Sequence, residues 1–112
     1  MKKIEAIIRP EKVDEVLAAL EDAGYAGIMI TEIKGHGKQK GLTQQWRGKE
    51  YRVSLLPKVK IELVVKDSDA GRISEALIKT AKTGNIGDGK IFISGIDNCI
   101  RIRTEEEGDK AL

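Results

Sequence analysis

The sequence has few of the residues on which several common protein classes depend. Its one cysteine, Cys99, has no second cysteine with which to form an intrachain disulfide or a paired-thiol metal or redox site, so we expect a buried thiol. Aromatic residues are 4% of the 112 residues and no RNP pattern is present, which argues against an RNA-recognition sheet that stacks bases. No apolar run approaches the length of a membrane span.

Charge of one sign is also lacking. The 20 basic and 18 acidic residues leave a formal net charge of +2, which implies no strong attraction to nucleic acid or to anionic lipid. The apolar stretch after Met1, Lys2 and Lys3 is too short for a signal peptide, so we expect a cytoplasmic protein. The length suits one domain, residues 1–112.

The hydrophobic spacing predicts four strands and two helices. Alternating apolar residues predict strands at residues 3–9, 27–34, 59–66 and 91–96, with a short extended end at 100–103. A first helix starts at Pro10, carries Val13, Val16, Leu17 and Leu20, and ends at Gly24. A second helix is capped by Asp67 or Ser68, carries Ile73, Leu77, Ile78 and Ala81, and stops at residues 83–85.

The order strand, helix, strand, strand, helix, strand predicts an α+β, ferredoxin-like βαββαβ fold with both helices on one face of the sheet. The opposite face mixes charged residues with apolar ones such as Ile7 and Val64. Those apolar side chains would be exposed to water in a monomer, so we expect this face to pack against other copies of the chain.

Two glycine-rich stretches, residues 35–41 and 87–90, lie next to predicted strands and contain lysines. Backbone N–H groups in such turns converge on anions, and a lysine neutralises them. A motif as short as Gly87-Asp88-Gly89-Lys90 also fits an ordinary turn, but the repeated glycine, lysine and arginine chemistry favours a polyphosphate site. No Walker A pattern GxxxxGK[ST] is present, and no dinucleotide GxGxxG follows the first strand. The stretch from about residue 37 to 55 shows no sustained apolar period, which predicts a long flexible loop. Residues 104–112 are predicted to form an acidic C-terminal tail.

Several longer motifs resemble the PII signal-transduction, or nitrogen-regulatory, family. They are Lys34-Gly35-His36-Gly37-Lys38-Gln39-Lys40-Gly41, Arg47-Gly48-Lys49-Glu50-Tyr51, Leu56-Pro57-Lys58-Val59-Lys60-Ile61-Glu62 and Thr83-Gly84-Asn85-Ile86-Gly87-Asp88-Gly89-Lys90-Ile91-Phe92. The match runs from Lys2 to Thr104. The resemblance implies a ferredoxin-like homotrimer that binds ATP or ADP in clefts between subunits, and 2-oxoglutarate with Mg²⁺ beside ATP.

Carried over by position, the resemblance also implies the binding residues. The base-side pocket would be Met29, Glu62 and Val64. Phosphates would meet Gly37, Lys38, Gln39, Gly87, Asp88, Gly89 and Lys90, with Arg101 and Arg103 from a neighbouring chain. The 2-oxoglutarate site would be Gln39, Lys40, Gly41, Lys58 and Gly87. Mg²⁺ would bind the Gln39 oxygen, as suits a cation that prefers oxygen ligands.

The resemblance implies a regulator rather than an enzyme, acting on an ammonium transporter or a nitrogen-assimilation enzyme. Trp46 and Arg47 would contact the partner, and Tyr51 is a candidate modification site. One alternative is an adenine-nucleotide energy sensor with no 2-oxoglutarate response. Another is an acylphosphatase-like enzyme on the same fold, but His36 is the only histidine and is expected at the surface, which leaves no second reacting group.

Overall fold

The computed structural model describes residues 1–37, 43–46, 49–52 and 55–112, the two short inner ranges as main chain only. Its strands are β1 (Lys2–Ile8), β2 (Met29–Gly35), β3 (Thr43–Trp46), β4 (Lys49–Arg52), β5 (Leu56–Val65) and β6 (Lys90–Gly95). Its helices are α1 (Val13–Asp22) and α2 (Ala70–Ala81). Within these described residues, neither helix has the length and apolar character that a bilayer-spanning segment needs.

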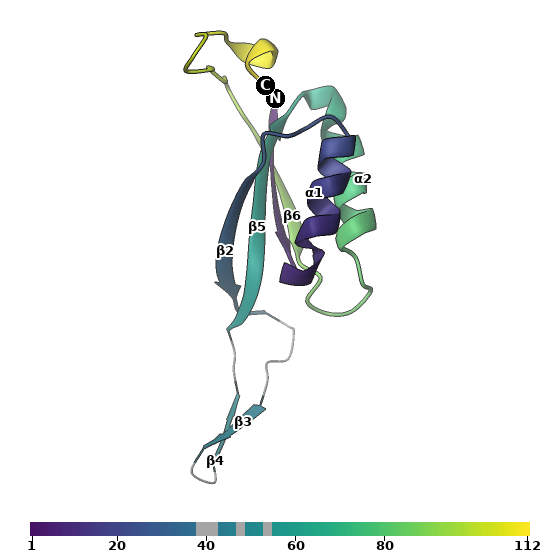
Figure 1. The fold of residues 1–112 in the computed structure, drawn as a ribbon, viewed down its shortest axis with the longest axis vertical. Coiled ribbons are helices and arrows are strands. Elements are labelled where there is room, and N and C mark those ends of the chain that lie inside the picture. Colours follow the sequence, from purple (N-terminus) through teal and green to yellow (C-terminus); the bar gives the residue numbers. More distant parts are fainter. Residues whose placement is uncertain (38–42, 47–48, 53–54) are drawn as a thin grey trace.

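The main sheet has the strand order β2-β5-β1-β6, and every neighbouring pair is antiparallel. Both helices lie on one face of this sheet (Figure 1). The predicted α+β, ferredoxin-like arrangement is therefore confirmed, with β1, β2, β5 and β6 as its four strands.

The core lies between the sheet and the two helices. Residues of one parity along β1 and β5 face the helices and are buried, whereas their neighbours are not. The buried apolar side chains are Ile4, Ala6, Ile8, Val59, Ile61, Leu63 and Val65 of the sheet and Val16, Leu20, Ile73, Leu77 and Ala81 of the helices. This alternation is what a sheet covered on one face requires.

Three details of the second half of the chain differ from the predictions. Ile78 is not a core residue, because 52% of its surface is exposed. Asp67 and Ser68 do not cap α2, since they lie in a 3-10 turn (Asp67–Asp69) in which the Asp67 carboxylate contacts the main-chain nitrogen of Met1. Cys99 is half-buried rather than buried.

The ends of the elements also depart from the sequence-based expectations. Residues 100–103 do not form an extended end: only Ile100 makes a β-bridge, to Glu107, and a turn follows it. The interval expected to lack regular structure contains β3 and β4, which form a hairpin paired in a separate two-stranded sheet. Figure 1 shows this hairpin extending beyond the end of the main sheet.

The sheet face away from the helices, here called the open face, combines ion pairs with apolar side chains. Lys3 contacts Glu5 at 3.1 Å, and Lys60 contacts Glu62 at 2.9 Å. Phe92, which pairs with Glu5 across β1 and β6, lies on the same face with 55% of its surface exposed. The structure therefore places an apolar ring beside charged groups on a face that no helix covers.

Candidate functional site

A cleft of about 430 Å³ lies where the end of β2, the start of β5 and the turn before β6 meet. Glycines form much of its wall, and two lysines and the only histidine lie at its edge. Its lining residues are Ile7, Gly35, His36, Gly37, Leu56, Lys58, Ile86, Gly87, Gly89, Lys90 and Phe92. The two glycine-rich stretches singled out in the sequence therefore meet in one place.

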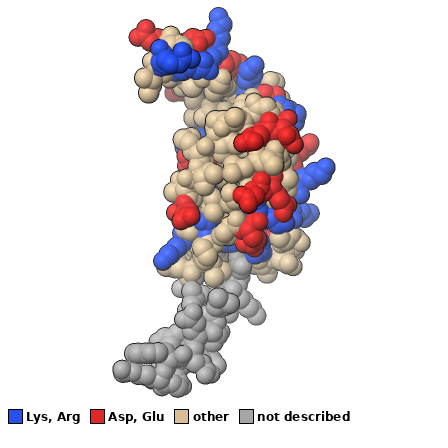
Figure 2. Space-filling view, in the orientation of Figure 1, with Lys and Arg blue, Asp and Glu red and all other residues tan. Residues whose placement is uncertain are grey.

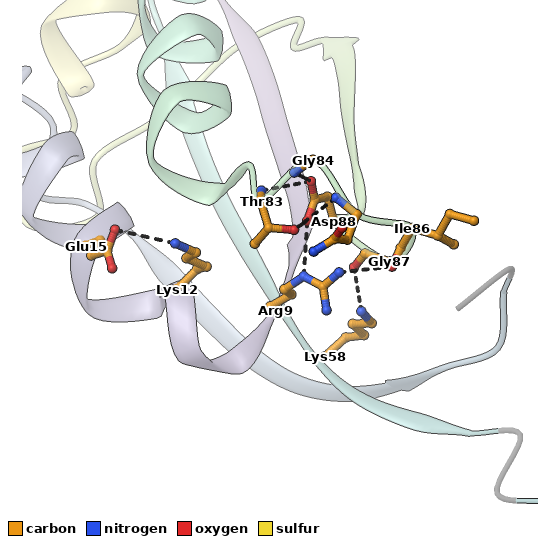
Figure 3. A network of polar contacts seen from close by, with 10 residues as sticks. Arg9, Lys12, Glu15, Lys58, Thr83, Gly84, Ile86, Gly87 and Asp88 are labelled. Atoms are coloured by element: carbon orange, nitrogen blue, oxygen red, sulfur yellow. Dashed lines mark hydrogen bonds and ion pairs between the residues drawn. The ribbon is translucent and has the colours of Figure 1, made fainter. Parts of the chain in front are cut away.

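Hydrogen bonds of the Asp88 side chain stabilise the turn of residues 86–90. The carboxylate of Asp88 accepts hydrogen bonds from the Thr83 hydroxyl (2.5 Å), the Thr83 N–H (2.9 Å) and the Gly84 N–H (2.8 Å). The Arg9 Nε also donates to it, at 3.1 Å (Figure 3). These bonds, the Thr83 hydroxyl first, hold the pKa of the Asp88 carboxyl well below its ordinary value. Asp88 is thus an ionised anchor of the turn.

Two cations reach the main-chain oxygens of the same turn. Lys58 Nζ donates to the Gly87 oxygen at 2.6 Å, and Arg9 Nη2 donates to the Ile86 oxygen at 2.9 Å. Partial burial lowers the pKa of Lys58, and the nearby Arg9 guanidinium lowers it further. Figure 3 shows both side chains directed at the turn. The turn that lines the cleft therefore has two positively charged side chains bound to it.

The path of the turn requires glycine at two positions. Gly87 and Gly89 have φ values of 104° and 98°, in the left-handed region that side chains disfavour. At Gly89 the main chain also passes so close to β1 that a Cβ would lie 1.7 Å from the Ile7 oxygen. The turn can pack against β1 only because this residue has no side chain.

Lysine side chains and glycine-rich main chain suit an anion with several oxygens. Among the described residues, no group of three or more His, Cys, Asp and Glu side chains could hold a metal ion. Asp88 in particular is committed to the turn and to Arg9.

The predicted nucleotide residues fall in two groups on the sheet. Gly37, Gly87, Gly89 and Lys90 line the cleft, together with the predicted 2-oxoglutarate residue Lys58; the Asp88 carboxylate points into the turn, so only its main chain remains for a phosphate. Met29, Glu62 and Val64 form the second group: Met29 pairs with Glu62, which lies in register with Glu5 and, beyond it, with Phe92 of the cleft wall. Six residue steps of β2 run from Met29 to Gly35, about 20 Å of strand. None of these three residues lines the cleft.

The remaining predicted residues lie elsewhere. Arg101 and Arg103 belong to the segment after β6, which Figure 1 shows at the end of the main sheet opposite the β3–β4 hairpin. Lys38, Gln39, Lys40, Gly41 and Arg47 are outside the described residues, as are the side chains of Trp46 and Tyr51. Their predicted roles stay predictions.

Sequence reasoning missed several residues in and around the cleft, among them Arg9, Ile7 and His36. Arg9 is 79 residues from Asp88, and nothing in the local pattern announced that contact. Ile7 supplies the oxygen against which Gly89 packs. His36, expected to be a plain surface residue, is exposed but lines the cleft. Only its position between two glycines at the end of a predicted strand could have indicated this.

The fold and the cleft define a small ferredoxin-like protein with a glycine- and lysine-lined cleft at one end of its sheet. Comparison of the sequence with protein families identifies it further: the model for "Nitrogen regulatory protein P-II" matches residues 1–106. The chain belongs to this P-II family, whose members are regulatory signal transducers.

Relatives match over the full chain. The chain is 57% identical to "Nitrogen regulatory protein P-II 2" of Methanothermobacter thermautotrophicus over all 112 residues, which cover 97% of that protein. It is 57% identical to "Nitrogen regulatory protein P-II" of Rhodospirillum rubrum and 54% identical to "Nitrogen regulatory protein P-II 1" of Escherichia coli, with complete coverage of each chain in both cases. The similarity supports nitrogen regulation as the general role.

Proposed function

We propose that this protein senses ATP or ADP together with 2-oxoglutarate and passes that state to a partner in nitrogen assimilation. The observation that carries the proposal is the cleft between β2, β5 and the 86–90 turn, where glycine main chain and the side chains of Lys58 and Lys90 surround a space of about 430 Å³. Such a space suits a polyphosphate. The members of the P-II family are regulatory signal transducers, which supports a sensor rather than a catalyst.

The nucleotide would be shared between two copies of the chain. The base-side group (Met29, Glu62 and Val64) does not line the cleft that contains Gly89, which supports contributions from different chains to one ligand. The open face, with Phe92 half exposed, supplies a surface on which copies can pack. We therefore propose the homotrimer, in which Arg101 and Arg103 approach a neighbour's phosphates.

The proposed 2-oxoglutarate site is centred on Lys58. Its ammonium group now donates to the Gly87 oxygen, and a carboxylate arriving beside the turn would provide a stronger, charged acceptor. The Gln39, Lys40 and Gly41 main chain would complete the site. Mg²⁺, if bound with ATP, would supply positive charge between the phosphates, the Gln39 side chain and the ligand.

The proposed output is the segment that leaves β2 and returns at β5. It starts beside the cleft at Gly37 and includes the β3–β4 hairpin. A ligand bound in the cleft would therefore lie next to the base of this segment. We propose that Trp46 and Arg47 contact the partner, an ammonium transporter or a nitrogen-assimilation enzyme. Tyr51, on β4, is the candidate modification site.

A second candidate is an adenine-nucleotide sensor without a 2-oxoglutarate response. The observation that favours it is the hydrogen bond from Lys58 to the Gly87 oxygen, because a lysine already satisfied within the chain gains less from a carboxylate. The same cleft and the same copies would then report only the ratio of ATP to ADP.

Calorimetric titration of 2-oxoglutarate into the protein with Mg²⁺-ATP, with Mg²⁺-ADP and with neither separates the two candidates. We expect binding only with Mg²⁺-ATP, and its loss in Lys58→Ala, while the control Lys79→Ala, on the exposed side of α2, binds as the unchanged protein does. Nucleotide binding without any 2-oxoglutarate response would favour the second candidate. Absence of nucleotide binding would refute both.

A further inference from the structure

The chain after β6 folds back on itself as a C-terminal hook, residues 98–112. Ile100 forms a β-bridge with Glu107, and the Gly108 N–H donates to the Cys99 oxygen at 2.9 Å. The Arg101 N–H donates to the Glu106 oxygen, also at 2.9 Å. The hook is therefore an ordered element with its own pairing.

The hook holds the Arg101 guanidinium between two oxygens of its own chain. Nη1 lies 3.2 Å from Glu106 Oε1, and Nη2 donates to the Leu112 main-chain oxygen, also at 3.2 Å. Both nitrogens at the end of the guanidinium fork are thus engaged. Figure 2 shows basic and acidic side chains side by side at this end of the molecule.

The main chain of the hook is bent in the way that places Glu106 opposite Arg101. Glu105 has a φ of 59°, the only positive value at a non-glycine residue in the described part of the chain, and its N–H donates to the Arg101 oxygen at 2.8 Å. A glutamate in the left-handed region is uncommon and is kept only where the surroundings require it. The bend thus serves the contact between Glu106 and Arg101.

We propose that Glu106 competes with nucleotide phosphates for Arg101, so that the C-terminal hook is an internal inhibitor of nucleotide binding. The proposal rests on the proposed function, in which Arg101 contacts phosphate. A guanidinium whose two terminal nitrogens are held by Glu106 and by the Leu112 oxygen cannot offer both of them to a phosphate while these contacts remain. The phosphate must therefore displace the Glu106 carboxylate, and the hook loses its side-chain contacts when nucleotide binds.

Competition of this kind sets the nucleotide concentration at which the protein responds. The Arg101 and Glu106 side chains are 38% and 42% exposed, so the ion pair is solvated and weak. A weak competitor shifts the affinity modestly without abolishing binding, which suits a sensor of an abundant metabolite. The hook would raise the dissociation constant for nucleotide rather than close the site.

The test is calorimetric titration of ATP into the full chain and into Glu106→Gln. Removing the competing charge should tighten ATP binding about two- to fivefold, the range that an exposed ion pair allows. Glu105→Gln is the matched control: it removes the same charge one residue away, and its side chain makes no hydrogen bond or ion pair within the described residues. It should change ATP affinity by less than half as much.

A double-mutant cycle assigns the effect to Arg101. In an Arg101→Gln background, Glu106→Gln should no longer tighten ATP binding. An equal gain in that background, or equal affinities for the unchanged protein and both glutamate variants, would overturn the competition while leaving nucleotide binding intact. Failure of ATP to bind any of the proteins would instead refute the proposed function, and the competition with it.

A readout without nucleotide checks the contact itself. In ¹⁵N–¹H spectra of arginine side chains, Glu106→Gln should shift the Arg101 Nε–Hε signal, and Glu105→Gln should leave it in place. Addition of ATP to the unchanged protein should move the same signal. An Arg101 signal insensitive to Glu106→Gln would contradict the hook contact even if ATP binds.

Discussion

Among single residues, Asp88 and Gly89 shape the cleft more than any side chain that faces it. Asp88 ties the turn to Thr83, Gly84 and Arg9, and Gly89 lets the turn pass against the main chain of Ile7. The lysines can meet a ligand only if this turn keeps its path. Substitutions at these two positions therefore test how the cleft is built, apart from what binds it.

Gly89→Ala should destabilise the protein by about 2–4 kcal/mol, combining the left-handed penalty with overpacking against the Ile7 oxygen. Gly84→Ala is the matched control, because Gly84 has a φ of 90° but open space around the added Cβ. It should lose only about 1–2 kcal/mol. Urea unfolding measures both, and equal losses would show that the approach to β1 is unimportant.

Asp88→Asn should change the response of stability to acid. A carboxyl whose pKa is lowered by folding stabilises the protein fully above its unfolded pKa of about 3.9, and this contribution is lost as pH falls toward the folded pKa. Asp88→Asn should therefore be less stable than the unchanged protein at pH 7, with the gap closing below about pH 4. Thermal unfolding across pH measures the gap.

The control for Asp88→Asn is Asp97→Asn. Asp97 is exposed and its carboxylate makes no hydrogen bond or ion pair within the described residues. It should follow the unchanged protein at every pH. A gap for Asp88→Asn that stays constant down to pH 2 would mean that the ionised carboxylate contributes nothing beyond its shape.

Among the elements, those with a strong hydrophobic period could be predicted and those held by polar pairing could not. The buried alternation of β1 and β5 and the apolar stripe of α2 follow from the core that they share. The β3–β4 hairpin is polar, and two residues, Arg47 and Gly48, separate its strands. A two-residue connection is typical of a β-hairpin, but the sequence analysis did not use it to predict one.

The site, like the elements, could be predicted where local sequence chemistry identifies it and not where it depends on long-range contacts. Glycines and lysines at strand ends identify the cleft through local chemistry, and Lys58 and Gly89 lie in it. The contact between Arg9 and Asp88 could not be read from the sequence, because it depends on the register in which Ile7 of β1 pairs with Lys90 of β6. Contacts set by register over about 80 residues have no local pattern.

The β3–β4 hairpin should be less protected from hydrogen exchange than the main sheet. In the described residues it pairs only with itself, and an isolated two-stranded hairpin is marginally stable in water. Amides of 43–46 and 49–52 should exchange about 100-fold or more faster than those of 59–65 in the ligand-free protein. Exchange followed by mass spectrometry resolves these ranges, and equal protection would contradict the expectation.

In the whole molecule, the open face points to association of several chains. Phe92 lies half exposed on this face, which carries its own ion pairs and which no helix covers. An apolar side chain in that position stays in water unless another copy packs against it. The proposed homotrimer would cover this face.

Sedimentation at micromolar concentration should give three times the chain mass of 12.3 kDa. Phe92→Asp should shift the protein toward the monomer, since burying an unpaired carboxylate between copies costs about 2 kcal/mol or more. Ile78→Asp is the matched control, because Ile78 is exposed to nearly the same extent, 52% against 55%, but lies on α2, across the sheet from the open face. It should keep the trimer mass. A 12.3 kDa species from the unchanged protein, or dissociation by both variants alike, would show that copies do not associate through the open face, and the nucleotide site would then need another arrangement.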